Sequence, residues 1–167
     1  NIGIVNFDKS TENGQLREEG FRDTVLKDDR ANITASINVK STITDAREGT
    51  ERMLLDNPQI NVIVTFNEWT TLGVGDAVEA LEAGERTQVV AFDSNVKSIG
   101  MLEKGNVDAL IVQNPYAMGY LGIEQINTLL NGQKPEKKET ATSSILVTRE
   151  NMYDDKSQKA LFSFEEK

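Results

Sequence analysis

The sequence has 167 residues, of which 38% are hydrophobic and 27% charged, and this suits one large globular domain or two small ones. Its formal net charge of −9 opposes contact with a phosphate backbone, so we expect no nucleic-acid partner for this segment. The lack of cysteine and histidine excludes disulfides, thiol nucleophiles and histidine-based metal or acid–base chemistry, and we expect no cofactor. Because the sequence begins directly with strand-like residues, we take it as a piece of a longer protein.

In the first third of the chain, apolar patterns of two kinds alternate. Residues 2–5 predict a short buried strand, and a polar loop follows at residues 6–14. Apolar side chains recur at helical spacing in residues 15–27 and 45–56, which predicts two helices. Between them, residues 33–39 alternate apolar and polar side chains, as a half-buried strand at the edge of a sheet does.

The next unit combines a buried strand with a largely apolar helix. Residues 62–66 predict the strand, which runs into Asn67, and residues 70–83 predict the helix, with Gly84 as its stop. The LGVGD stretch of this helix matches part of a dinucleotide-binding fingerprint. That fingerprint needs its glycines at a strand-to-helix turn, whereas these lie within a helix, so we do not expect a nucleotide here.

Two further strands each end in a polar side chain. The apolar runs at residues 88–92 and 107–112 lead into Asp93 and Gln113. In open α/β sheets ligands bind outside the carboxyl ends of the strands, where the loops converge on one crevice. A carboxylate accepts hydrogen bonds from neighbouring hydroxyls, and an amide both donates and accepts them. This chemistry predicts a polar, hydroxyl-bearing ligand.

Helix signals follow each of these strands. Ser94 is the predicted N-cap of a helix that Gly105 ends. Asn114 and the proline after it fit the cap and first-turn positions of a helix over residues 115–131, which Gly132 ends.

The C-terminal part of the chain is more polar. A lysine-rich connector at residues 133–139 leads to a strand at residues 144–148 and a charged tail at residues 151–167, for which we expect a short helix. The apolar contacts of the tail are predicted to be Leu161, Phe162 and Phe164. The alternation of strands and helices predicts an α/β three-layer sandwich with a mainly parallel sheet and right-handed crossovers.

For the residues singled out so far, a structural role competes with a ligand-binding role. Asp93 also suits a turn that leads into a helix, and Asn67 and Gln113 also suit loop amides with satisfied hydrogen bonds. Trp69, the single tryptophan, either stacks on an apolar face of the ligand or covers the start of the adjacent helix. Both interpretations remain open from the residues alone.

Four stretches occur in an order that resembles a known family. They are REEGF in the first helix, TFNEWTTLGVGDAVEAL, VVAFDSN and LIVQNPYAMGY. In order and spacing they resemble the type I periplasmic binding proteins, the ribose-binding family of receptors for ABC importers, and more distantly the sensing domains of LacI-type repressors. In that family the ligand lies between two α/β lobes joined by hinge crossings. The similarity covers the second lobe, and it implies that the first lobe lies outside these residues.

The resemblance assigns ligand contacts to individual residues. It implies that Asn67 hydrogen-bonds ligand hydroxyls, that Asp93 accepts hydrogen bonds from two sugar hydroxyls, and that Gln113 reaches the ligand from a hinge crossing. Where the family has a ligand-binding arginine in the first helix this sequence has Gln15, and Arg17 is a candidate nearby.

The resemblance also implies a division of the chain. Residues 1–113 correspond to the ligand-binding lobe, residues 114–139 to a hinge-crossing helix and connector that belong to the first lobe, and residues 140–167 to the last strand and tail. Without a first lobe, the helix at residues 115–131 is expected either to mediate self-association or to fold back onto its own sheet.

These observations predict a non-catalytic fragment of an extracytoplasmic receptor, periplasmic or a cell-surface lipoprotein, that binds a monosaccharide or similar polyol for an ABC permease. The alternative is the effector domain of a cytoplasmic LacI-type regulator. A small α/β enzyme is a third hypothesis, but the sequence contains neither a nucleophile elbow nor a phosphate-binding loop to support it.

Overall fold

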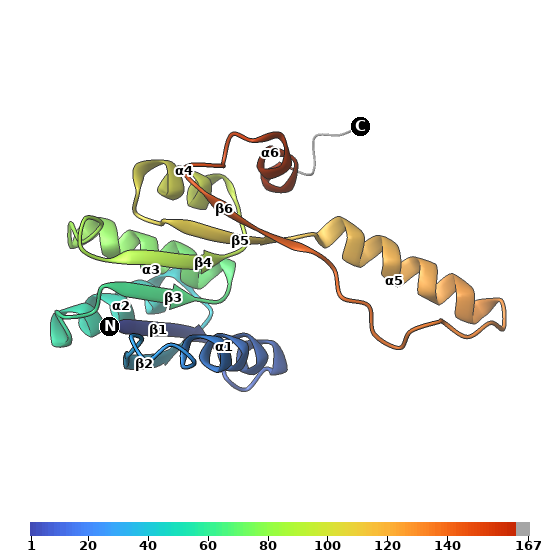
Figure 1. Ribbon diagram of the computed structural model, residues 1–167, viewed down its shortest axis with the longest axis horizontal. Helices are drawn as coiled ribbons and strands as arrows, with labels where there is room; N and C mark the ends of the chain where they lie inside the picture. The colour runs from blue at the N-terminus through green and yellow to red at the C-terminus, as the bar shows by residue number, and fades with distance from the viewer. Residues whose placement is uncertain (163–167) are drawn as a thin grey trace.

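The computed structural model describes residues 1–162, in which strands and helices alternate almost throughout (Figure 1). The elements are β1 (Ile2–Phe7), α1 (Glu12–Val25), β2 (Ile33–Val39), α2 (Ile43–Asp56), β3 (Val62–Thr65), α3 (Glu68–Ala80), β4 (Gln88–Phe92), α4 (Val96–Lys104), β5 (Ala109–Gln113), α5 (Pro115–Leu130), β6 (Ser144–Thr148) and α6 (Asp155–Leu161).

The strands form one six-stranded sheet in the order β2-β1-β3-β4-β5-β6. Neighbouring strands from β2 to β5 are parallel, and β6 runs antiparallel to β5. The predicted α/β class with a mainly parallel sheet is therefore confirmed, as is the position of residues 33–39 at a sheet edge. Because these strands are parallel, their carboxyl ends all lie along one side of the sheet, perpendicular to its edge strands. The candidate ligand residues lie along this carboxyl side, which is called the carboxyl edge below.

The core has two parts, one on each face of the sheet. On one face Ile4, Val64 and Phe66 meet Phe21 of α1, and the Phe66 ring lies 6.1 Å from the Phe21 ring. On the other face the strands pack against α2, α3 and α4, with fully buried Leu54 among the contacts. Helices thus cover both faces, which gives the expected three layers.

Several helix ends differ from the sequence prediction because a neighbouring polar residue supplies the cap. The first helix begins at Glu12 rather than residue 15, since Thr11 Oγ1 accepts a hydrogen bond of 3.1 Å from the Gly14 amide. The cap of α4 is Asn95 rather than Ser94, because Asn95 and Ser98 satisfy each other's backbone amides in a capping box.

The end of α3 was also predicted wrongly. The helix stops at Ala80, before Gly84, and the chain turns at Glu82, which adopts a left-handed φ of 48°. The predicted end of α4 at Gly105 is confirmed, because Gly105 is the C-cap of that helix and has a left-handed φ of 87°.

The glycines of the LGVGD stretch have a packing role. A Cβ atom on Gly73 would lie 2.5 Å from both the Ala46 Cβ and the Ile43 carbonyl oxygen of α2. Gly73 therefore permits the close approach of α2 and α3. It lies inside α3, as the sequence predicted, and not at a phosphate-binding turn.

Helix α5 extends away from the sheet (Figure 1). Asn114 caps it by accepting a hydrogen bond of 2.9 Å from the Ala117 amide, and Pro115 occupies its first turn, as predicted. None of its residues is buried, so the expectation that it folds back onto its own sheet is wrong. Tyr116 and Tyr120 stack on each other and remain largely exposed.

The tail contains the predicted short helix, α6, and buries Leu161, whereas Phe162 is 37% exposed. The predicted contact of Phe164 lies outside the described residues. Within residues 1–162, no helix has the length and apolar character needed to cross a bilayer.

Candidate functional site

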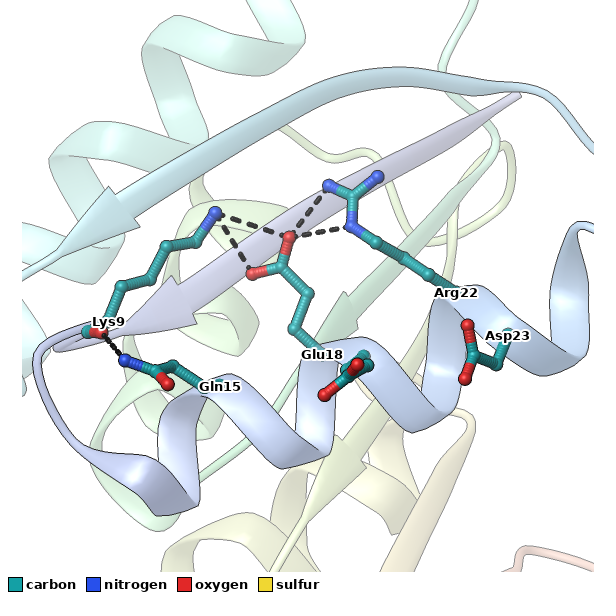
Figure 2. A pocket seen from close by; sticks show the side chains of 6 residues that line it. Lys9, Gln15, Glu18, Arg22 and Asp23 are labelled. Atoms are coloured by element: carbon teal, nitrogen blue, oxygen red, sulfur yellow. Dashed lines mark hydrogen bonds and ion pairs between the residues drawn. The ribbon is translucent and has the colours of Figure 1, made fainter.

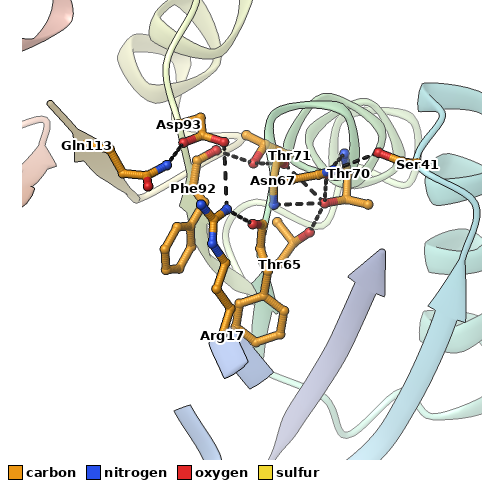
Figure 3. Close-up of polar contacts among 10 residues, drawn as sticks. Arg17, Ser41, Thr65, Asn67, Thr70, Thr71, Phe92, Asp93 and Gln113 are labelled. Atoms are coloured by element: carbon orange, nitrogen blue, oxygen red, sulfur yellow. Dashed lines mark hydrogen bonds and ion pairs between the residues drawn. The ribbon is translucent and has the colours of Figure 1, made fainter. Parts of the chain in front are cut away.

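The carboxyl edge of the sheet gathers polar side chains from α1, β5 and the β3–α3 and β4–α4 junctions (Figure 3). The sequence placed Asp93 and Gln113 at strand ends, and the structure brings both together with Arg17. Asn67 lies on the same edge, at the end of β3. These residues come from distant parts of the chain and meet because parallel strands end side by side.

Asp93 directly follows β4 and is tied to the neighbouring strand β5 by two hydrogen bonds. Its backbone amide donates a hydrogen bond of 3.0 Å to the Ile111 carbonyl oxygen, and its Oδ1 accepts one from Gln113 Nε2. Its φ of 65° lies in the left-handed region, which aspartate tolerates better than most residues. Its side chain is 28% exposed, so the carboxylate remains open to a ligand.

Arg17 approaches the same carboxylate from α1. Its Nη1 lies 3.9 Å from Asp93 Oδ2 and also donates to the Phe66 carbonyl oxygen. Its guanidinium carbon lies 4.9 Å from the centre of the Phe92 ring, and the side chain is only 16% exposed. Arg17 thus supplies a fixed positive charge beside Asp93.

Asn67 has the structural role that the sequence offered as one alternative. Its Oδ1 accepts a hydrogen bond of 2.9 Å from the Thr70 amide and so caps α3, while its Nδ2 donates to Ser41 Oγ at 2.6 Å. An amide nitrogen carries two hydrogens, which leaves one for a ligand. The ligand-binding role of Asn67 stays a prediction.

The other two predicted residues take separate positions. Gln15 Nε2 donates a hydrogen bond of 2.8 Å to the Lys9 carbonyl oxygen, in a depression along α1 (Figure 2). Trp69 lies in the first turn of α3 and is 48% exposed. The structure gives neither of them a hydrogen bond to Asp93 or Gln113.

A cavity of about 300 Å³ adjoins Asp93 and Gln113. It is lined by the polar residues Glu68, Asp93, Ser94 and Gln113 and by the apolar residues Val112, Pro115, Met118, Ala160 and Leu161. Glu68 was not among the predicted ligand residues. Its carboxylate accepts a hydrogen bond of 2.6 Å from Asn95 Nδ2, which ties the starts of α3 and α4 together.

A second polar cluster, also missed from the sequence, surrounds Glu18 on α1 (Figure 2). Its carboxylate accepts hydrogen bonds from Asn6 at 2.6 Å and Arg22 at 2.8 Å, and pairs with Lys9 at 3.1 Å. Burial of Glu18 works to raise its pKa, but these hydrogen bonds and the Lys9 charge outweigh burial and lower the pKa below its ordinary value. The i to i+4 spacing of Glu18 and Arg22 was the only sequence signal for it.

Within residues 1–162, no group of three or more histidine, cysteine, aspartate or glutamate side chains is placed to hold a metal ion. Carboxylate, guanidinium and amide groups thus meet at the carboxyl ends of the parallel strands, and groups of these types can hydrogen-bond hydroxyls.

Comparison with known proteins identifies the family. A model described as the periplasmic binding protein domain matches residues 1–134, so the chain belongs to that family. The ribose import binding protein of Haemophilus influenzae is 29% identical over 122 residues, which cover 73% of this chain and 41% of the relative. The D-ribose/D-allose-binding protein of Pseudomonas aeruginosa is 30% identical over 139 residues, covering 81% and 42%.

Solved structures agree with this assignment. The carbohydrate transporter solute binding protein of Agrobacterium radiobacter, in complex with D-arabinose, superposes with a TM-score of 0.90 at 28% identity and covers 96% of this chain and 54% of its own. A glucose-galactose binding protein of Geobacillus stearothermophilus gives a TM-score of 0.85 at 26% identity, with coverage of 91% and 54%. The chain therefore spans about half the length of these proteins.

Proposed function

We propose that this chain is the second lobe of an extracytoplasmic sugar-binding receptor for an ABC importer, and that the binding site is completed by a first lobe outside these residues. The observation that carries the proposal is the meeting of Asp93, Gln113 and Arg17 at the carboxyl edge of a sheet that belongs to the periplasmic binding protein family. The cited curated relatives are named for ribose or for ribose and allose.

The proposed ligand is a monosaccharide or a similar polyol. Asp93 accepts hydrogen bonds from two adjacent hydroxyls, and the charge of the carboxylate strengthens each of them. Gln113 both donates to Asp93 and offers its carbonyl oxygen to a ligand hydroxyl. Arg17 orients the carboxylate from the side of α1.

Capture rather than catalysis is the proposed activity. Sugar release to the permease follows from opening of the two lobes, and closure on the sugar is the state that the permease recognises. Residues 114–139 are proposed to belong to the first lobe, and the lack of any buried residue in α5 supports this division. The named transport function of the relatives favours this receptor over a LacI-type regulator.

A thermal-shift experiment on the whole protein that contains this chain tests the proposal. A sugar that binds the native state raises the melting temperature in a concentration-dependent manner. We expect a shift with one or more of D-ribose, D-allose, D-arabinose and D-galactose, and loss of that shift in Asp93→Ala. Asp29→Ala, in the exposed turn after α1, is the matched control and keeps the shift. No shift with any monosaccharide would contradict the proposal.

A further inference from the structure

The cavity beside Asp93 has a wall that comes from the end of the chain. Ala160 and Leu161 of α6 line it together with Val112 of β5 and Met118 of α5. None of the four sequence stretches that resemble the family includes α6. Helix α6 also begins after residue 134, where the family match ends, so this wall lies outside the matched region.

The position of α6 is fixed by the segment that precedes it. Asn151 closes the turn after β6, where its Oδ1 accepts from the Thr148 amide at 2.8 Å and its Nδ2 donates to the Leu146 carbonyl at 3.1 Å. Gln158 Nε2 then donates to the Met152 carbonyl oxygen at 2.6 Å. These bonds hold the helix against β5 and β6, which it contacts directly.

Apolar packing completes the attachment of α6. Leu161 is 8% exposed and joins the same core cluster as Val112 and Met152, with Ala160 packed against it. The end of α6 is therefore part of the folded lobe and not an accessory tail at its surface. Leu161 forms the anchor, and Ala160 presents the small side chain on the cavity side.

We propose that α6 forms one wall of the sugar site and that Ala160 limits the size of the ligand the site accepts. The inference rests on the proposed function. Asp93 and Gln113 bind ligand hydroxyls. An extra hydroxymethyl group that meets the apolar wall lowers the affinity, because Ala160 and Leu161 offer its hydroxyl no side-chain hydrogen-bond partner. A larger residue at position 160 therefore penalises a hexose more than the corresponding pentose.

The test compares affinities for D-ribose and D-allose, which differ by one hydroxymethyl group, with D-arabinose and D-galactose as a second pentose and hexose. Calorimetric titration of the whole protein gives the affinities. Ala160→Leu is expected to lower the ratio of hexose affinity to pentose affinity by roughly tenfold, which is the usual effect of one methylene group too many in an apolar pocket. Lys159→Leu adds the same side chain at the adjacent exposed position and leaves the ratio unchanged.

The affinity ratio distinguishes two roles for Ala160: contact with the ligand, and support of the fold alone. If Ala160→Leu weakens both sugars equally, or neither, Ala160 does not contact the ligand and the inference is overturned. A ratio that shifts in Ala160→Leu but not in Lys159→Leu supports it. Failure of all four sugars to bind the unsubstituted protein would overturn the proposed function, and this inference with it.

Discussion

Gln113, at the end of β5, donates a hydrogen bond of 2.5 Å from Nε2 to Oδ1 of Asp93, at the end of β4. The two residues meet because β4 and β5 are adjacent parallel strands: Phe92 pairs with Ile111, so Asp93 directly follows the last pair and Gln113 lies two residues beyond it. The Gln113 amide, together with Arg17 on the side of α1, thus sets the orientation of the carboxylate on which the proposed site depends.

Removal of that amide gives the first prediction. Gln113→Ala leaves the Asp93 carboxylate without its side-chain partner in β5, and we expect sugar affinity to fall by roughly tenfold or more, since a hydrogen bond to a charged group contributes about 1.5–3 kcal/mol. Calorimetric titration measures the loss. Gln133→Ala, in the exposed connector after α5, serves as the control. An unchanged affinity in Gln113→Ala would remove this residue from the site.

Arg17 is expected to support both the lobe and the site. Replacement by lysine keeps the charge but loses the planar group that lies over Phe92 and donates to the Phe66 carbonyl. We expect Arg17→Lys to lower the free energy of unfolding by about 1–2 kcal/mol, as measured by urea denaturation. Arg52→Lys, on the exposed face of α2, is expected to change it little. Equal effects of the two substitutions would contradict the role of Arg17.

The network around Glu18 predicts a pH dependence of stability. Because the folded state lowers the pKa of Glu18, its contribution is complete above the ordinary value of 4.5 and is lost as the pH falls through the lower folded value. Glu18→Gln removes this contribution. The stability difference between the unsubstituted protein and Glu18→Gln should therefore shrink as the pH is lowered below 4.5.

Denaturation at a series of pH values measures this difference. Glu19→Gln provides the control, because Glu19 is exposed on the same helix and its substitution also removes one negative charge. The prediction fails if the two substitutions show the same dependence on pH.

Two helical glycines are predicted to respond to alanine in opposite directions. Gly73→Ala forces a Cβ into the backbone of α2 and should destabilise the protein by about 2 kcal/mol or more. Gly100→Ala in α4 meets nothing within 4 Å and should stabilise by about 0.5–1 kcal/mol. Thermal denaturation distinguishes the two, and a destabilised Gly100→Ala would show that helix propensity does not dominate there.

The exposed apolar stripe of α5 predicts self-association of residues 1–167 produced alone. Tyr116, Tyr120, Ile123 and Leu130 recur at helical spacing and are all more than half exposed, with Ile123 at 68%. Ile123→Glu should shift the sedimentation profile toward the monomer, whereas Gln133→Glu, with the same change in charge, should not. A concentration-independent monomer for the unsubstituted chain would contradict this prediction.

The order of strands and helices, and the positions of Asp93 and Gln113, could be predicted from the sequence because both depend on local signals. Apolar runs mark strands, and a polar residue directly after each run marks the sheet edge. The sequence predicts Ser94 as the cap of α4 because serine and asparagine are both good N-cap residues. Only the spacing from Asn95 to Ser98, which allows a capping box, identifies Asn95 as the cap.

Contacts between distant segments could not be predicted in this way. Apart from Arg22 on the same helix, Glu18 collects partners that include Asn6 of β1 and Ser36 of β2, which become neighbours only once the strands pair. The same holds for the cavity wall, since no local pattern indicates that Ala160 lies beside Asp93. The exposure of α5 likewise depends on what the sheet leaves uncovered.

The pairing of β5 with β6 has a topological consequence. Gln113 and Ser144 are partners across the two strands, so the chain leaves the sheet and returns to it at one point. Residues 114–143 thus form an insertion between two paired strands, and its two ends lie side by side. A short turn joining Gln113 to Ser144 would complete an ordinary β-hairpin at little entropic cost, because closing a shorter loop costs less entropy. We therefore expect the lobe to fold without residues 114–143, and the boundary of the removed segment adjoins the Asp93 carboxylate.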